Sequence, residues 1–491
     1  MLKMNKKIVI TLLAVIVFLV SCKEQSDPAP SITLASCKLG TSLALCGTLR
    51  VYENRIANKG RKIDIHVAVI KATSPNPAPD PIFYLAGGPG GSAIEDGKRP
   101  QFSSSLSFNH DLVFVDQRGT GNSNRQTVSQ GFPDFAGLTP EQIDANTKAR
   151  AWEYPVLIIF TMDSRFYTTS LAMDDLDEVR AALGYDKINL VGYSYGATAT
   201  QYYLRQHEEH VRTVTLGGGS LLDKPVFELW AQNGQKAMNS IFDLCLADSS
   251  CIAAYPNLRT EFLELLSRLE TNPVIISFTD PSNQQPVSVT LSSDIFAASL
   301  RNMTTDAKND PNLPRLIHQA YQENYWKEFT QLYADGWTPQ WWGNLVMEHT
   351  IRCHEKWASF DPAAVAESSK GSYLAGWDIS LAKHQAFSCQ YTPEGVMPEG
   401  DSKQPGSNVP VLILNGELDP IDPPENMAGA NELWPNSLSL IGPYQGHSIS
   451  NMNEIMCWFS IMDKFINSGS ANGLDTSCMQ EVQPPIFNTH K

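Results

Sequence analysis

The first half of the chain alternates short apolar runs with longer amphipathic stretches. The runs end at glycine or polar clusters, which is typical of buried strands. Between Thr169 and Leu183 the apolar residues recur along one helical face, which predicts a helix. Strands that alternate with helices predict an α/β fold with a mostly parallel, doubly wound sheet. The predicted strands are 61–70, 81–86, 111–115, 187–191 and 211–216, and the predicted helices are 169–183 and 197–206.

The pattern becomes mainly helical between residues 226 and 406. Helices are predicted at 227–246, 258–270 and 313–334, and a minor strand pair at 274–280 and 287–291. The sheet pattern then returns, with strands at 409–414 and 437–441 and a helix at 454–466. A helical block between two parts of one sheet indicates a lid. We therefore predict a core of 31–225 and 407–491, with an inserted lid at 226–406.

The composition is that of a large globular protein. The 491 residues are 42% hydrophobic and 18% charged, which is enough to bury a large core. The net charge of −15 at pH 7 argues against nucleic acid or an anionic membrane surface as a partner. The cysteines form no C-x-x-C pair, and His354-Glu355 lacks a second histidine at the zinc spacing. We therefore expect neither a metal nor a cofactor.

The N-terminus has the features of a processing segment. Three lysines precede the apolar run Ile8 to Val20, which is too short for a comfortable membrane span. The run ends in Leu19-Val20-Ser21-Cys22, which resembles the lipobox of bacterial lipoproteins. We predict a lipoprotein signal peptide at 1–21, a lipid on Cys22 and a tether at 22–30. The mature protein would then be membrane-anchored, in the periplasm or at the cell surface. An ordinary secretory signal or an anchor helix is the alternative.

The cysteines favour an exported protein. Without Cys22, eight of the nine remain, and an even number in an exported chain indicates disulfides. Eight cysteines allow 105 pairings, so spacing alone leaves the connectivity open, and free buried thiols are the alternative. Short loops close most easily, which favours sequential neighbours. The expected pairs are Cys37–Cys46, Cys245–Cys251, Cys353–Cys389 and Cys457–Cys478.

The motif Gly192-Tyr193-Ser194-Tyr195-Gly196 carries the first candidate for chemistry. It fits G-x-S-x-G and lies between the strand predicted at 187–191 and the helix predicted at 197–206. A tight turn of this kind lifts the serine Oγ above the edge of the sheet, where it can act as a nucleophile. Ser194 is therefore the candidate nucleophile.

A nucleophilic serine needs a base, and the base needs an acid that orients it. Asp419 and His447 each follow a predicted strand, and the order Ser, Asp, His is that of α/β-hydrolases. Because all three residues follow strand ends, we expect them to meet at one edge of the sheet. Asp422 and Glu417 are rival acids. Alone, Asp419 is also explained as a turn former and His447 as a surface histidine.

The tetrahedral intermediate of such a reaction needs donors for its oxyanion. The backbone N–H of Tyr195, directly after the nucleophile, is one candidate. The second should come from the glycine-rich loop after strand 81–86, where Gly87 and Gly88 lie. The alternatives for this loop are a plain Gly/Pro turn or a phosphate loop, but no G-K-[ST] follows it.

The chain contains five motifs of interest: GGPGGS (87–92), DQRGTGNS (116–123), GYSYGA (192–197), GELDP (416–420) and GHS (446–448). This set is similar to the proline iminopeptidase and tripeptidyl aminopeptidase family of α/β-hydrolases, with a closer match to its secreted tripeptidyl branch. The resemblance spans residues from about 80 to 450. It implies an α/β-hydrolase fold with an inserted lid and an activity that removes residues from peptide N-termini. Ala86 replaces a common histidine, and Asp422 replaces a threonine of the family's acid loop.

Such an aminopeptidase should hold the ammonium group of its substrate with a buried carboxylate. The family resemblance indicates Glu355, in a segment that carries such an acid in secreted relatives; a solvated glutamate on a helix is the alternative. Six of the ten tryptophans lie between Trp326 and Trp377, where they line a pocket or form the core of the lid.

The leading hypothesis is a serine aminopeptidase that releases proline-type residues or tripeptides and takes peptides as substrates. A serine esterase or lipase is the first alternative, and a catalytically silent binding protein is the second. The preferred peptides and the oligomeric state do not follow from the sequence.

Overall fold

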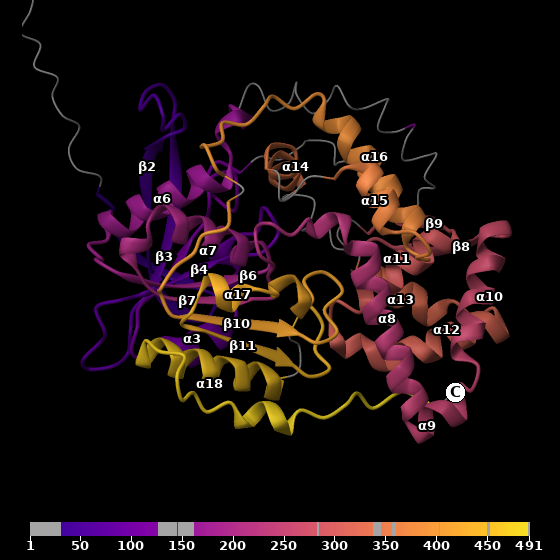
Figure 1. Ribbon diagram of the computed structural model, residues 1–491. Helices are drawn as coiled ribbons and strands as arrows, with labels where there is room; N and C mark the ends of the chain where they lie inside the picture. Colours follow the sequence, from indigo (N-terminus) through magenta and orange to yellow (C-terminus); the bar gives the residue numbers. More distant parts are fainter. Residues whose placement is uncertain are drawn as a thin grey trace, which may run out of the picture.

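A nine-stranded sheet forms the centre of the protein (Figure 1). The computed structural model describes residues 31–125, 145, 162–281, 284–336, 345–355, 360–401, 403–448 and 452–489. The strand order is β1-β2-β3-β5-β4-β6-β7-β10-β11. The first three pairings are antiparallel, and every pairing from β5 to β11 is parallel. The strands are β1 (Ala35–Leu39), β2 (Ser42–Tyr52), β3 (Lys62–Ile70), β4 (Ile82–Leu85), β5 (Leu112–Val115), β6 (Ile188–Tyr193), β7 (Val211–Gly217), β10 (Val411–Gly416) and β11 (Ser437–Gly442).

Helices cover both faces of this sheet. Successive strand residues point to opposite faces, so Phe83 and Tyr84 belong to two different hydrophobic clusters. Phe83 packs in the cluster of α6 (Thr169–Ala182) and α7 (Tyr195–Gln206). Tyr84 packs in the cluster of α2 (Ala93–Asp96), α3 (Pro100–Leu106) and α18 (Met452–Ser468), and Figure 1 shows α3 and α18 on the side of the sheet away from α6 and α7. The predicted fold class, a doubly wound and mostly parallel α/β sheet, is confirmed.

A mainly helical block lies between β7 and β10, and we call it the inserted block. Its first part, α8 to α13, has its own hydrophobic core, whereas α14 to α16 add Val346, Ile351, Val365 and Ala382 to the core on the sheet. Figure 1 shows the first part gathered at one end of the sheet. The elements are η3 (Val226–Glu228), α8 (Trp230–Ala247), α9 (Ser249–Ala254), α10 (Leu258–Thr271), β8 (Val274–Thr279), β9 (Pro286–Leu291), α11 (Ser293–Met303), η4 (Ala307–Asn312), α12 (Leu313–Glu323), α13 (Lys327–Gly336), α14 (Leu345–His354), α15 (Pro362–Ser368) and α16 (Ala375–Cys389).

One expectation about an element is wrong, and one pair of strands was missed. The helix predicted at 313–334 is two helices, because Asn324 adopts a left-handed conformation with φ of 50° and ends α12. The β1–β2 hairpin was not predicted. Its strands are half-exposed, so they lack the continuous apolar run that marks the central strands. The boundaries 31–225, 226–406 and 407–491 stay predictions. The elements from η3 to α16 follow β7. After β10 come η7 (Pro424–Met427) and α17 (Ala430–Leu433), and after β11 come α18 and then η8 (Ser477–Glu481).

Four disulfides join neighbouring elements, and they are the pairs expected from short loop closure. Cys37–Cys46 joins β1 to β2, Cys245–Cys251 joins α8 to α9, and Cys353–Cys389 joins α14 to α16. Cys457–Cys478 joins α18 to η8. The predicted signal peptide, Cys22 and the tether lie outside the described residues and stay predictions. Among the helices of the described ranges, none is both long enough and apolar enough to cross a membrane.

Candidate active site

The G-x-S-x-G motif forms a sharp turn between β6 and α7. Ser194 has φ of 56° and ψ of −125°, a conformation that costs a non-glycine residue free energy. Its backbone N–H donates to the carbonyl of Gly217 at 2.9 Å, which holds the turn against β7. A Cβ at Gly196 would lie 2.1 Å from the carbonyl oxygen of Leu85, so only glycine allows α7 to start this close to β4. The predicted turn therefore has a steric basis in the structure.

The structure brings Ser194, His447 and Asp419 into one hydrogen-bonded chain. His447 Nε2 lies 3.0 Å from Ser194 Oγ, and His447 Nδ1 lies 2.8 Å from Asp419 Oδ2. The side chain of Asp419 is fully buried and that of His447 is 14% exposed. All three residues follow the carboxyl ends of parallel strands, β6, β10 and β11, as expected. This geometry lets the imidazole take a proton from the serine while the carboxylate orients its other nitrogen.

The electrostatics favour the charged form of His447. Burial acts against the imidazolium, but the charge and hydrogen bond of Asp419, together with the charge of Asp422, outweigh burial and raise the pKa of His447 to about 9. Asp419 is held in place by its own loop, because its Oδ1 accepts the N–H groups of Ile421 and Asp422 at 2.8 and 2.9 Å. Stabilising the imidazolium makes it easier for His447 to take the proton of the serine hydroxyl.

The rival acids lie farther from the histidine. Glu417 is exposed, and its Oε2 accepts the backbone N–H of Tyr444 at 3.0 Å. Asp422 is buried, but its Oδ2 lies 3.9 Å from His447 Nδ1, beyond hydrogen-bond distance. Asp419 is therefore the acid that contacts the imidazole.

Both parts of the predicted oxyanion site lie beside the nucleophile. A Cβ built on Gly87 would lie 3.2 Å from Ser194 Cβ and 3.7 Å from Ser194 Oγ, so the glycine loop runs directly along the serine. Gly88 has φ of 128°, which only glycine adopts readily. Tyr195 opens α7, and the first N–H groups of a helix have no acceptor within the helix. The glycine loop and the residue after the nucleophile therefore both lie beside Ser194, where an oxyanion would form.

Asp116, the first residue of the DQRGTGNS loop, holds the end of the glycine loop in place by hydrogen bonds. Asp116 is fully buried, and its Oδ1 accepts from Ser92 Oγ at 2.6 Å while its Oδ2 accepts the N–H of Asn122 at 3.1 Å. Ser92 in turn caps α2, which follows the glycine loop. The sequence analysis did not assign this role. The sequence feature that could have indicated it is a carboxylate directly after an apolar strand, because a charge buried there needs several hydrogen-bond partners.

Arg118 anchors the same loop in the protein interior. Its side chain is fully buried and makes a bidentate pair with Asp175 of α6 at 2.7 and 2.8 Å. It also donates to the carbonyls of Glu53 at 2.9 Å and Phe166 at 2.7 Å. The loop, the residue after β2, η1 (Ser164–Phe166) and α6 therefore share one buried cation.

We expect Arg118→Met to lower the free energy of unfolding by about 3 kcal/mol, because it leaves two buried carbonyls without this donor and removes the bidentate partner of Asp175. Arg55, 2.7 Å from Asp175 Oδ1, then remains as a cation on that carboxylate. Urea denaturation measures this change. Arg50→Met is the matched control, because Arg50 and Asp64 are 72% and 58% exposed and 3.9 Å apart. The control should change stability by less than about 0.5 kcal/mol. Equal effects of the two substitutions would show that the Arg118 cluster does not stabilise the fold.

Glu355, the candidate for holding a substrate amine, is buried at the end of α14. Its carboxylate accepts the backbone N–H of Thr169 at 2.6 Å and the hydroxyl of Thr169 at 2.9 Å, at the start of α6. The Thr169 hydroxyl also lies 2.9 Å from the hydroxyl of Tyr195, the residue after the nucleophile. The alternative of a solvated helix glutamate is wrong, because only 2% of Glu355 is exposed. Its contacts connect the inserted block to the nucleophile turn.

A group of metal-ligand residue types lies on α6 and beside the end of α7. Asp177, His207 and His210 have ligand atoms within 4.8 Å of one another. However, Arg180 Nε donates to Asp177 Oδ1 at 2.6 Å, and the hydroxyl of Tyr203 donates to the same oxygen at 2.8 Å. A guanidinium already neutralises this carboxylate, so the residues present do not favour a cation there.

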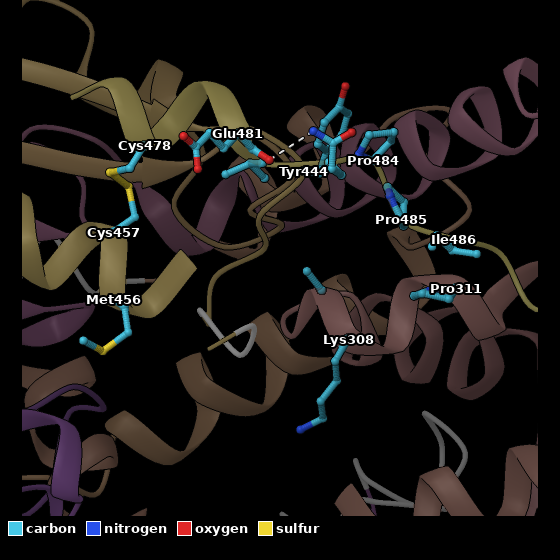
Figure 2. A pocket seen from close by; sticks show the side chains of 13 residues that line it. Lys308, Pro311, Tyr444, Met456, Cys457, Cys478, Glu481, Pro484, Pro485 and Ile486 are labelled. Atoms are coloured by element: carbon cyan, nitrogen blue, oxygen red, sulfur yellow. Dashed lines mark hydrogen bonds between the residues drawn. A yellow bond between two sulfur atoms is a disulfide. The ribbon is translucent and has the colours of Figure 1, made fainter. Parts of the chain in front are cut away.

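A cavity of about 840 Å³ is lined in part by Tyr444, which belongs to the loop that carries His447. Figure 2 shows Tyr444 and the Cys457–Cys478 disulfide on one side of it and Lys308 and Pro311 of η4 on another. The C-terminal residues Glu481 to Ile486 close it. The described residues that line this cavity include none of the three catalytic candidates, so the cavity is separate from the hydrogen-bonded chain.

Comparisons with known proteins agree with this fold. A sequence model of the family described as alpha/beta hydrolase fold matches residues 80–450. The serine protease Hip1 of Mycobacterium tuberculosis is 29% identical over 180 residues, which are 34% of this chain and 35% of that protein. The tripeptidyl aminopeptidase of Streptomyces coelicolor is 26% identical over 196 residues, 38% of this chain and 34% of that protein. The chain thus spans about a third of the length of each relative. The solved proline iminopeptidase of Mycobacterium smegmatis aligns with 86% of this chain and 98% of its own at 14% identity, with a TM-score of 0.38.

Proposed function

Because the chain belongs to the alpha/beta hydrolase fold family, we propose that it is a serine aminopeptidase, which releases residues from the N-termini of peptides. The observation that carries the proposal is the hydrogen-bonded chain from Ser194 through His447 to Asp419, with distances of 3.0 and 2.8 Å. The relatives named as a serine protease and a tripeptidyl aminopeptidase support a peptide as the substrate. An esterase would use the same residues, so the substrate is decided by experiment.

In the proposed reaction, Ser194 Oγ attacks the scissile carbonyl carbon while His447 Nε2 takes the hydroxyl proton. Asp419 holds the imidazole and stabilises its positive charge. The carbonyl oxygen becomes an oxyanion, which backbone N–H groups of the glycine loop and of Tyr195 stabilise. His447 then gives the proton to the departing amine, and an acyl group remains on Ser194. Water, activated by the same imidazole, releases the acyl group and restores the serine.

We further propose that Glu355 supplies the negative charge that distinguishes a peptide with a free N-terminus from other substrates. Three facts support this: the carboxylate is buried, it lies at the end of α14 where the inserted block meets the core, and Thr169 links it to Tyr195 beside the nucleophile. A carboxylate with little solvent around it attracts an ammonium group more strongly than an exposed one does.

We expect Glu355→Gln to lower kcat/KM by about 100-fold for peptides with a free N-terminus, because about 3 kcal/mol of charge pairing is lost. Cleavage of a simple p-nitrophenyl ester should change by less than about threefold, because the ester has no amine to bind. N-acetylated peptides should be poor substrates of the wild-type protein for the same reason.

Glu367→Gln is the matched control for this experiment. Glu367 lies on α15 of the same block, pairs with Lys370, and its side chain is 73% exposed. It should leave all three activities unchanged. Equal losses of peptide and ester cleavage in Glu355→Gln, or rapid cleavage of acetylated peptides by the wild type, would contradict the aminopeptidase proposal and favour the esterase.

A further inference from the structure

A second carboxylate, that of Asp422, lies near the same nitrogen of His447 that Asp419 contacts. Asp422 Oδ2 lies 3.9 Å from His447 Nδ1, the nitrogen that Asp419 contacts at 2.8 Å. Only 6% of Asp422 is exposed, so little solvent screens its charge. Two buried carboxylates therefore face one imidazole nitrogen.

The position of this second carboxylate is determined by several contacts. The N–H of Asp422 donates to Asp419 Oδ1 at 2.9 Å, which folds the loop so that both side chains point to the same nitrogen. Asn415 Nδ2 donates to the carbonyl of Asp422 at 2.8 Å. The hydroxyl of Ser220 donates to Asp422 Oδ1 at 2.5 Å and itself accepts from Asn426 at 2.8 Å. Ser220, supported by Asn426, thus holds Oδ1 of Asp422, and Asn415 holds its backbone carbonyl. The other side-chain oxygen, Oδ2, is the one that faces the imidazole.

Among the described residues, Tyr193 and Asp306 are further titratable groups on this side of the molecule, and neither is a cation. The ring of Tyr193 packs against the imidazole with centroids 5.7 Å apart, and burial, followed by the charges of Asp419, Asp422 and Asp306, raises its pKa, so it stays neutral. Asp306 pairs with Lys308 at 2.6 Å, which offsets its charge. The two acids of the β10 loop therefore dominate the field at the histidine.

The charges of Asp419, Asp422 and His447 affect one another's pKa values because the three side chains lie close together. Burial raises the pKa of Asp422, the imidazolium of His447 lowers it, and the charge of Asp419 raises it further. In return, Asp422 contributes to the raised pKa of His447, after burial and Asp419. A negative charge on Asp422 stabilises a positive charge on the imidazole.

We propose that Asp422 is a positioning acid of the triad, which stabilises the imidazolium of His447 from behind Asp419 and partly replaces Asp419 as the partner of Nδ1 when that carboxylate is removed. The proposal rests on the serine–histidine chemistry proposed above, but on neither peptide nor ester specificity. It also gives a physical meaning to the aspartate that stands here in place of the threonine of the family's loop.

The test is the pH dependence of kcat/KM for p-nitrophenyl acetate, a substrate that needs no amine recognition. The acid limb of this profile reports the loss of the proton from His447 in the free enzyme. Removing the negative charge of Asp422 destabilises the imidazolium and lowers its pKa. We therefore expect Asp422→Asn to move the acid limb about one pH unit lower, with a loss of kcat smaller than about tenfold. Glu417→Gln, an exposed acid of the same loop, should leave the limb in place.

A second comparison tests the replacement of Asp419. We expect Asp419→Asn to keep about tenfold more activity than the double variant Asp419→Asn/Asp422→Asn, because one carboxylate still faces Nδ1. Asp422→Thr, read by the same pH profile, is the second variant if the asparagine variant fails to fold. An unmoved acid limb in an active variant, together with equal activities of the single and double variants, would overturn the proposal. A wild-type protein that hydrolyses neither ester nor peptide would overturn the proposed function as well.

Discussion

Replacing Ser194 with alanine is expected to lower kcat by about a millionfold for every substrate that the protein hydrolyses. The Oγ atom is the only atom of this side chain that bonds His447, and it is the atom that forms the acyl group in the proposed reaction. Without it, the base has no proton to take, and only binding and oxyanion stabilisation remain. The measurement is kcat for a peptide with a free N-terminus and for an ester.

Ser448→Ala is the control for the Ser194 experiment. Ser448 is an exposed serine next to His447, so its loss removes a hydroxyl from the neighbourhood without touching the proposed nucleophile. It should change kcat by less than about threefold, because exposed side chains away from the chemistry contribute little. A Ser194→Ala variant that keeps a tenth or more of the activity would mean that another residue attacks the substrate.

Replacing Asp419 with asparagine is expected to lower kcat by about 10³- to 10⁴-fold. The amide is nearly the same size, but it carries no charge, and its NH2 group favours the wrong tautomer of His447. Because the raised pKa of His447 depends on this carboxylate, the residual activity should also extend to lower pH. The measurement is kcat over a range of pH, with the melting temperature measured in parallel.

Glu417→Gln is the control for the acid, because Glu417 lies two residues away and its exposed carboxylate accepts the backbone N–H of Tyr444. A normal melting temperature with a loss of less than tenfold in Asp419→Asn would show that Asp419 does not orient the base. A shift of the acid limb to higher pH would contradict the electrostatic account, since a lost negative charge cannot stabilise an imidazolium.

The sequence predicts well the features that depend on local patterns. Strands β6 and β10 are mostly apolar and buried, and β11 alternates serine with apolar residues. Because the candidate catalytic residues follow the ends of these strands, the strand boundaries also locate Ser194, Asp419 and His447. Parallel strands bring their carboxyl ends to one edge, which is why three residues far apart in the chain meet. The four disulfides are the pairs that short loop closure favours, although spacing alone left the connectivity open.

Features that depend on long-range contacts are not visible in the sequence. Arg118 and Asp175 are 57 positions apart, and Glu355 and Thr169 are 186 apart, so no local pattern pairs them. The division of the inserted block into a part with its own core and a part on the sheet depends on tertiary packing. The sequence identified Asp422 only as a rival acid. The fold of the loop decides that Asp419 lies 2.8 Å and Asp422 3.9 Å from His447 Nδ1.

Covalent labelling tests the central claim most directly, because a fluorophosphonate reacts with a serine only when a base activates it. Treating the folded protein with such a probe and mapping the adduct by mass spectrometry should give one modified peptide, with the label on Ser194. The His447→Ala variant should give none. A label on another residue, or a Ser194 that stays unmodified while the protein hydrolyses its substrate, would contradict the account.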